Sequence, residues 1–138
     1  MTEFIDPDRD QFEQFKALPR DEPVLMLNLV RFRPQARYPD GEVVSGAKAY
    51  ARYGEASSPI FERVGGRIVW RGKPQNVLIG PSDEQWHAAF IARYPTASAF
   101  LEMVTDEAYR SAVKHRQAAV KTSRLIRMAE LPVTDQFA

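Results

Sequence analysis

The sequence predicts an α+β domain in which two strand–helix–strand units form one sheet, preceded by an additional N-terminal helix. Three observations support this fold class. Residues 24–32 form a continuous apolar run, residues 47–64 show helical periodicity up to a Gly-Gly pair, and residues 86–127 contain a strand, a helix broken once, and a returning strand. With 138 residues the chain has the size of one domain, so we expect a single domain over residues 1–138.

The additional helix is expected at residues 7–18, because Asp6 followed by Pro7 is typical of an N-cap and a first helical position. A short apolar stripe follows and stops before Pro19. The next element, residues 24–32, reads VLMLNLVRF. This run is too apolar for a half-exposed strand, so we expect a strand that is covered on both faces.

The second helix is expected at residues 47–64, after a turn signal at residues 38–41. Pro59 inside it either kinks the helix or begins its second half. Gly65-Gly66 is expected to end it with a left-handed cap. One face of this helix carries Tyr50, Tyr53, Ser57, Phe61 and Val64.

The remaining elements complete a β-α-β-β-α-β order. They are expected to be a strand at 67–71 with 77–79 as a continuation, a strand at 85–94, a helix at 97–104, a helix at 106–120 and a strand at 123–131. Asp106 is the expected N-cap between the two helices. This order predicts a ferredoxin-like sandwich with an extra N-terminal helix.

One face of the predicted sheet needs a partner. Both crossover helices of this fold lie on the same face, so the other face is left open. The strands are apolar on both sides, since Leu25, Leu27 and Leu29 alternate with residues such as Val24 and Met26. A bare apolar face is larger than monomers tolerate. We therefore expect a two-fold homodimer that packs sheet to sheet.

Composition excludes several function classes. A net charge of +1 gives no basis for binding nucleic acid or an anionic membrane. The chain has no cysteine, which fits a reducing cytoplasm, and its acidic N-terminus is unlike a signal peptide. No apolar run reaches the roughly 20 residues that span a bilayer. Two histidines without a ligand-type spacing, and no phosphate-binding glycine motif, predict neither a metal nor a cofactor.

Several segments together resemble a known family. They are MLNLVRF, YPDGEVVSGAKAYARYG, GGRIVW, EQW, ARYPTASAFLEMV, DEAYRSAVKHR and SRLI, in this order. The series resembles the DUF1330 family over about residues 24–128. The resemblance implies a dimeric α/β barrel of ferredoxin-like subunits and no established activity. That superfamily includes cofactor-free monooxygenases, muconolactone isomerases, dye-decolorising peroxidases and haem-degrading enzymes, and the fold alone selects none of them.

The chain departs from the family pattern at one position. Where we expect the family to favour Trp-Asp after the third-strand glutamate, this chain has Trp86-His87. If the acidic residue has a role, this protein has changed or lost it. His87 and Arg93 fall on one face of a regular third strand and would bracket an apolar floor. His87 is then the candidate catalytic proton shuttle. The alternative is that this face meets solvent or the dimer partner.

Other polar residues in apolar elements are candidate ligand-binding groups. Asn28 interrupts an apolar strand, and it either orients a ligand carbonyl or bonds to neighbouring backbone. Arg31 lies on the opposite face, where it binds a carboxylate or forms an ordinary ion pair. Tyr50 and Tyr53 either reach into a cleft between helix and sheet or pack with their hydroxyls at its rim.

The aromatic and basic candidates have structural alternatives as well. Trp86 and Tyr94 lie on the other face of the third strand, where large aromatic residues are usually core or interface. His115 and Arg116 end a helix, where cations are favourable through the helix dipole alone. Arg116 continues an apolar helix face and so is a candidate for turning inward.

Three functional hypotheses follow. The first is binding of a small organic molecule, carboxylated molecules among the candidates, with metal-free isomerase or oxygenase chemistry. The second is a non-catalytic ligand-binding or sensor dimer that uses the same cleft. The third is haem binding or degradation, because Asn28, Trp86 and His115 are similar in residue type and order to the polar set of haem-degrading barrels.

Overall fold

The expected order of elements is confirmed in a computed structural model that describes residues 3–138. The elements are α1 (Arg9–Ala17), β1 (Val24–Phe32), α2 (Gly46–Arg63), β2 (Arg67–Gly72), β3 (Ala88–Tyr94), α3 (Ala97–Thr105), α4 (Glu107–Ala119) and β4 (Val120–Met128). This order is the ferredoxin-like pattern with α1 added before it.

The four strands form one antiparallel sheet in the order β2-β3-β1-β4. β1 lies in the centre, and its midpoint, Asn28, pairs with Phe90 of β3 and Leu125 of β4. Because residues directly opposite each other share a face, these three side chains point to the same side of the sheet. Val69 is an extra residue in β2, where the register with β3 shifts.

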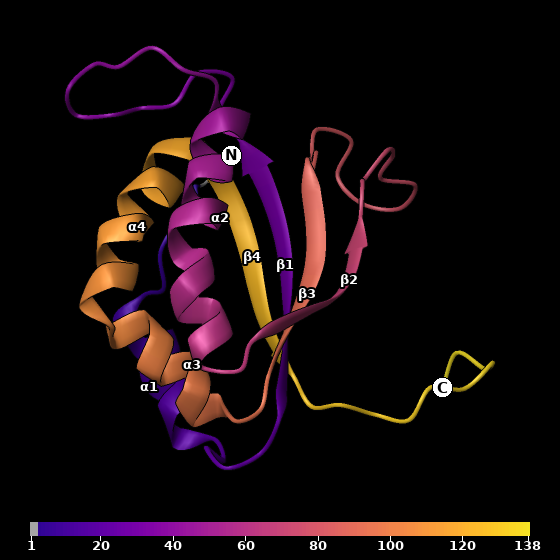
Figure 1. The fold of residues 1–138 in the computed structure, drawn as a ribbon. Coiled ribbons are helices and arrows are strands. Elements are labelled where there is room, and N and C mark those ends of the chain that lie inside the picture. Colours follow the sequence, from indigo (N-terminus) through magenta and orange to yellow (C-terminus); the bar gives the residue numbers. More distant parts are fainter. Residues whose placement is uncertain (1–2) are drawn as a thin grey trace.

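All four helices lie on one side of this sheet, as Figure 1 shows. The even-numbered residues of β1 face them, with Val24, Met26 and Val30 almost fully buried. Buried residues form two separate core clusters on this covered face. One surrounds Val24, Met26 and Phe100, and the other surrounds Val30 and Val120. Asn28 lies between the two clusters on β1.

The opposite side of the sheet, here called the open face, has no helix over it (Figure 1). Trp70 of β2 and Ile126 of β4 are about half exposed there, at 51% and 47%. By register the open face includes Leu25, Leu27, Leu29, Arg31, Trp70, Ala89, Ile91, Arg93, Arg124, Ile126 and Met128. The expectation that β1 is covered on both faces therefore holds for one face within a single chain.

Several element boundaries differ from the expected ones. The N-cap of α1 is Asp8, whose side chain accepts from the Gln11 amide, and not Asp6. β3 begins at Ala88, so residues 85–87 belong to the preceding connection. No strand forms at 77–79, where Leu78 and Ile79 are 86% and 93% exposed.

The last strand begins earlier than expected, at Val120, because the chain becomes extended directly after α4 and pairs with Phe32. Pro59 lies within one continuous helix, α2. Two local expectations are confirmed. Gly65 adopts a left-handed conformation with φ of 85° after α2, and Asp106 caps α4 by accepting from the Ala108 and Tyr109 amides.

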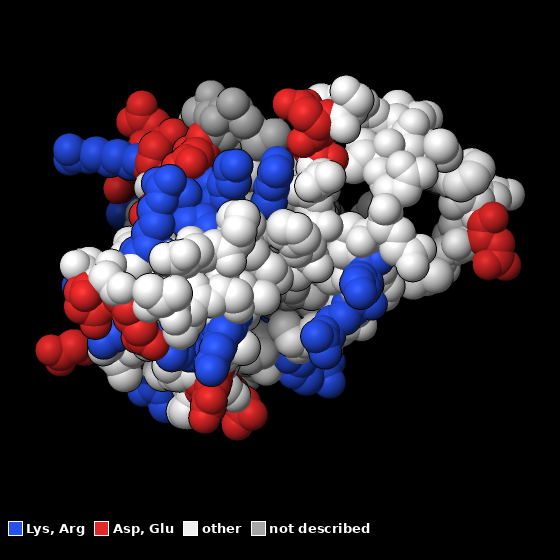
Figure 2. All heavy atoms as spheres, turned by 90° about the horizontal axis from the view of Figure 1, so that it is seen from above, with Lys and Arg blue, Asp and Glu red and all other residues white. Residues whose placement is uncertain are grey.

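Charges of both signs are mixed on the helical side of the molecule, and the part that projects on the open-face side is largely uncharged (Figure 2). This distribution agrees with the net charge of +1. Among residues 3–138, no helix is long and apolar enough to cross a membrane.

Candidate functional site

A cavity of about 1450 Å³, open to solvent on one side, lies between the helices and the covered face of the sheet and extends along β4 to Arg124 and Ile126. Its floor is formed by the middle of the sheet, and its roof by α2 and α4. The N-terminal segment and α1 form a further wall, with Phe4, Ile5, Phe12 and Phe15 among its residues. The cavity thus occupies the space that separates the two core clusters.

Asn28 is the polar group at the centre of the floor. Its Nδ2 donates to the carbonyl of Met26, two residues earlier on the same strand, at 3.0 Å. Phe90 and Leu125 flank it on the neighbouring strands and also line the cavity. Asn28 therefore bonds to neighbouring backbone, which is one of the two roles expected for it, and its side chain also faces the cavity.

Four tyrosines surround the cavity. The hydroxyls of Tyr53 on α2 and Tyr109 on α4 are 2.7 Å apart and join the two helices. The Tyr94 hydroxyl donates to the sulfur of Met103, and its ring packs against Phe100 within the first core cluster. Tyr50 packs against Tyr53, and its hydroxyl makes no hydrogen bond to another residue in the described range 3–138.

Burial keeps these phenols neutral. It raises the pKa of Tyr50, Tyr94 and Tyr109, with smaller contributions from the neighbouring tyrosines. The charge of Arg116 offsets part of this increase in the pKa of Tyr50 and Tyr109. At neutral pH each hydroxyl therefore carries its proton and can donate a hydrogen bond.

Arg116 extends from α4 into the cavity wall. Its guanidinium donates to the carbonyl of Ile5 and, at 3.1 Å, to the hydroxyl of Ser123. Arg127 of β4 also lines the cavity and donates to the carbonyls of Phe15 and Pro19, at the end of α1. Both arginines thus hold the N-terminal segment in place through neutral acceptors.

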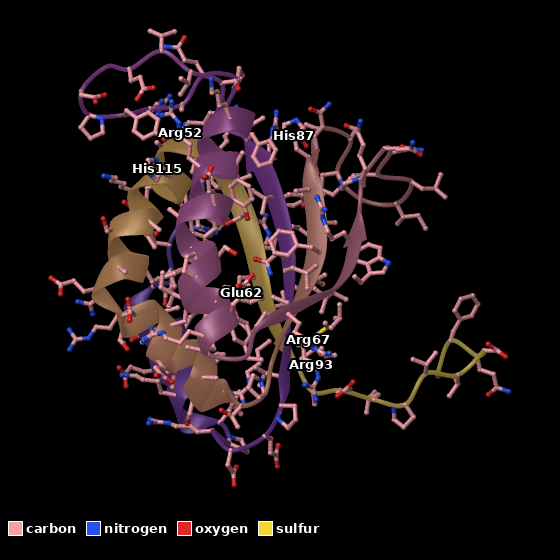
Figure 3. All side chains as sticks on the ribbon, viewed as in Figure 1. Arg52, Glu62, Arg67, His87, Arg93 and His115 are labelled. Carbon is pink, nitrogen blue, oxygen red and sulfur yellow. The ribbon has the colours of Figure 1, made fainter. Side chains whose placement is uncertain are left out.

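The remaining candidates lie outside the cavity, as Figure 3 shows for those that it labels. His87 and Arg93 are at opposite ends of β3 (Figure 3). The His87 ring stacks on Phe32, and its Nδ1 accepts from the Phe32 amide at 2.9 Å. Arg93 is on the open face and pairs with Glu130 at 3.5 Å. These two residues therefore do not bracket a common pocket.

Trp86 and Tyr94 are also separated. Tyr94 is in the core, whereas Trp86 lies against the guanidinium of Arg124, at 5.3 Å from the ring centroid. Arg31 is on the open face and donates to the carbonyl of Asp83. The expected placement of Arg31 opposite Asn28 is confirmed by the register of β1.

His115 lies on the outer side of α4, where its Nδ1 is 2.6 Å from the Tyr38 hydroxyl (Figure 3). Burial and the nearby Lys114 lower its pKa. Arg52 packs over the Tyr38 ring and pairs with Glu42. This cluster fastens the β1–α2 connection to the helices and does not reach the cavity.

Sequence reasoning missed two parts of the cavity. Tyr109 is not among the candidates named from the sequence, and its pairing with Tyr53 depends on the packing of α2 on α4. No local sequence pattern predicts the wall formed by Phe4 and Ile5. It depends on pairing of the N-terminal segment with β4, through the Ser123 amide and the Phe4 carbonyl. Within residues 3–138, no group of three or more metal-ligating side chains is positioned to hold an ion.

Comparison with known protein families identifies the family of this chain. Residues 42–129 match the family described as "Domain of unknown function (DUF1330)". The chain belongs to the DUF1330 family. The match begins after β1, so α1 and the N-terminal wall of the cavity lie outside it. No protein of curated function matches this DUF1330 chain.

Solved structures confirm the fold of this family member. A protein of unknown function from Rhodopseudomonas palustris, RPA0582, is 55% identical over 96% of this chain and 100% of its own, with a TM-score of 0.92. A dimeric protein of ferredoxin-like fold from Bacteroides fragilis is 13% identical over 78% and 96%, with a TM-score of 0.51. SnoaB, a cofactor-independent oxygenase from Streptomyces nogalater, is 13% identical over 83% and 99%, with a TM-score of 0.55.

Proposed function

We propose that the protein binds a small organic molecule with a large apolar part in the cavity between the helices and the covered face. The observation that carries this proposal is Asn28, a strand-centre amide that faces a space of about 1450 Å³ between the two core clusters. Unfilled apolar space destabilises a fold, whereas aromatic walls with a few polar groups are typical of ligand sites.

The polar groups of the cavity are chiefly hydrogen-bond donors. The Tyr50 hydroxyl has no partner among residues 3–138, and Arg116 is held by neutral acceptors. A ligand that fits them carries an acceptor, such as a carbonyl, enol or carboxylate oxygen. The apolar remainder of the ligand would lie over Phe90 and Leu125.

The donor set favours binding without turnover. Neither histidine lines the cavity, and the buried tyrosines keep their protons at neutral pH. The cavity-lining carboxylates, Asp6 and Glu62, are at exposed positions. A general base must reach the proton it abstracts, and among residues 3–138 neither a histidine nor a buried carboxylate lines this cavity.

Metal-free isomerase or oxygenase chemistry is the second candidate, and the Tyr53–Tyr109 pair favours it. Two hydroxyls 2.7 Å apart can pass a proton to a substrate oxygen. Tyr109→Phe removes one hydroxyl and keeps the ring. Turnover of a bound compound that disappears in Tyr109→Phe, with an unchanged dissociation constant, would support this candidate.

The residues suggested for haem do not converge on one site. Asn28 faces the cavity, but Trp86 packs on Arg124 and His115 pairs with Tyr38 on the outer side of α4. The two histidines of the chain are therefore not placed to ligate an iron held in the cavity.

We further propose that the open face packs against a second copy of the chain. Half-exposed Trp70 and Ile126 continue a row of partly buried leucines there, and contiguous apolar patches of this kind mark interfaces. A two-fold axis brings the same patch of two subunits together. The B. fragilis protein of similar fold is described as dimeric, which supports the proposal.

A variant with a larger side chain inside the cavity tests ligand binding directly. N-phenyl-1-naphthylamine is a neutral apolar fluorophore, and we expect the wild-type protein to bind it saturably at one site per subunit. Asn28→Phe places a ring in the cavity and should remove this binding. Asn76→Phe makes the same substitution in the exposed β2–β3 connection and should leave it unchanged. Equal binding by both variants, each with a native melting curve, would contradict the proposal.

A further inference from the structure

Arg116 differs from the other arginines around it in the way its charge is compensated. Four arginines pair with carboxylates of the chain, and these are Arg33, Arg52, Arg63 and Arg93. Arg116 has no ion pair with any residue of the range 3–138, although it is only partly exposed. An arginine removed from water without a counter-charge carries a desolvation cost.

Four other arginines that line the cavity also lack a carboxylate partner among residues 3–138. Arg67 and Arg110 are exposed to water, whereas aromatic rings cover Arg124 and Arg127. The guanidinium of Arg124 lies 4.9 Å from the Phe4 ring centroid and 5.3 Å from that of Trp86. The guanidinium of Arg127 lies 4.7 Å from the Phe15 centroid. Cation–π contacts of this kind offset part of the cost of partial burial. No such contact is present for Arg116 within the described residues.

The surroundings of Arg116 supply further donors. Two of its N–H groups donate to the Ile5 carbonyl and the Ser123 hydroxyl, which leaves other N–H groups of the guanidinium free for a ligand. The positive charge of Arg116 lowers the pKa of Tyr50, although burial raises this pKa by a larger amount. A planar cation and a neutral hydroxyl donor that line the same cavity match an oxygen anion.

We propose that the cavity ligand is a monoanion whose carboxylate, or a group of equivalent chemistry, binds to Arg116 with the Tyr50 hydroxyl as a second donor. This inference rests on the proposed ligand-binding function and names its substrate class. The apolar body of the ligand extends over the sheet floor at Asn28. The sequence suggested carboxylate binding at Arg31, and the structure puts Arg31 on the open face.

A matched pair of probes tests the charge requirement. 2-Naphthoate and 2-naphthalenemethanol share one skeleton and differ in the anionic group, and their affinities are measured by isothermal titration calorimetry. Wild-type protein should bind the carboxylate at least about tenfold more tightly, because hydrogen bonds between charged groups are the strong ones. Arg116→Gln should reduce the ratio of carboxylate affinity to alcohol affinity to about one.

Controls separate this inference from the proposed function. Lys48→Gln removes the same charge at an exposed site outside the cavity and should preserve the preference. Arg116→Lys keeps the charge and should retain a reduced preference for the carboxylate over the alcohol. This variant also provides the test if Arg116→Gln does not fold. Wild-type binding of both probes with equal affinity would overturn the anion inference while supporting a ligand cavity. Absence of binding by either probe would overturn the proposed function itself.

Discussion

The two faces of the sheet are built from alternating residues of the same strands, yet they have different neighbours. On the covered face, Met26 and Val30 are buried by the helices, and a cavity remains around Asn28. On the open face, Leu27 pairs with Ile91 and Ile126, and no helix of residues 3–138 covers them. Both faces are apolar, so hydrophobicity alone does not distinguish an internal core from an interface. The difference lies in which partner each face meets.

The largest expected effect comes from a charge on the open face. Leu27→Arg places an unpaired cation at the centre of the proposed interface and should raise the dimer dissociation constant by more than about 100-fold. Sedimentation velocity over a concentration series measures this change. Val43→Arg introduces the same charge at a residue that is 76% exposed in the β1–α2 connection, and it should leave the dimer intact. A wild-type protein that is monomeric at micromolar concentration would refute the interface.

On the covered face, the corresponding change acts on folding. Phe100 is 8% exposed and packs against Phe15 and Tyr94. Phe100→Ala should lower the free energy of unfolding by about 3–5 kcal/mol, as expected for an aromatic core residue. Urea denaturation at one protein concentration measures it, with Leu101→Ala on the same helix, at a more exposed position, as the control that should cost less. A loss below about 1 kcal/mol would show that this face is not the main core.

A substitution at Asn28 distinguishes a role in ligand binding from a role in the stability of the covered face. Asn28→Leu removes the central polar group, whose hydrogen bond to the Met26 carbonyl is local and within β1. We expect the free energy of unfolding to change by less than about 1 kcal/mol, because a single neutral hydrogen bond contributes on that order. Affinity for 6-hydroxy-2-naphthoate, which carries a second oxygen at the end of the ring system away from the carboxylate, should nevertheless fall several-fold, whereas affinity for 2-naphthoate should not. A large loss of stability with unchanged affinity would make Asn28 a structural residue.

The smallest expected effect is that of pH on binding. Burial raises the pKa of Tyr50, so its hydroxyl stays protonated below its elevated pKa and remains a donor throughout neutral pH. Affinity for 2-naphthoate should therefore be constant between about pH 6 and pH 9. The same shift stabilises the fold below the ordinary tyrosine pKa of about 10, and this contribution is lost as pH rises further. A decline in affinity with a midpoint near pH 6.5 would instead implicate a histidine.

Much of the fold could be predicted because its signals are local. The apolar run of β1 gave both of its boundaries, and the left-handed Gly65 and the Asp106 cap were found from residue type alone. Errors occurred where tertiary contacts decide. Residues 85–87 continue the alternation of β3, but His87 stacks on Phe32 and Trp86 packs on Arg124. Strand pairing therefore begins only at Ala88.

The candidate site was predictable only in part for the same reason. Helical spacing placed Tyr50 and Tyr53 on one inward face, and strand alternation placed Asn28 opposite Arg31. Alternation does not reveal which face of a strand the helices cover, so His87 and Arg93 could not be separated from Trp86 and Tyr94. The inward turn of Arg116 was one of two open alternatives, and its contact with Ile5 joins residues 111 positions apart.

A crystal structure of the protein with 2-naphthoate tests the central claim most directly, that the covered face binds a ligand and the open face binds a second subunit. We expect density for the ring system over Asn28 and Phe90, the carboxylate at Arg116 and Tyr50, and two subunits in contact through Leu27 and Ile126. Density for 2-naphthoate between the open faces, with the cavity under α2 and α4 empty, would contradict the account.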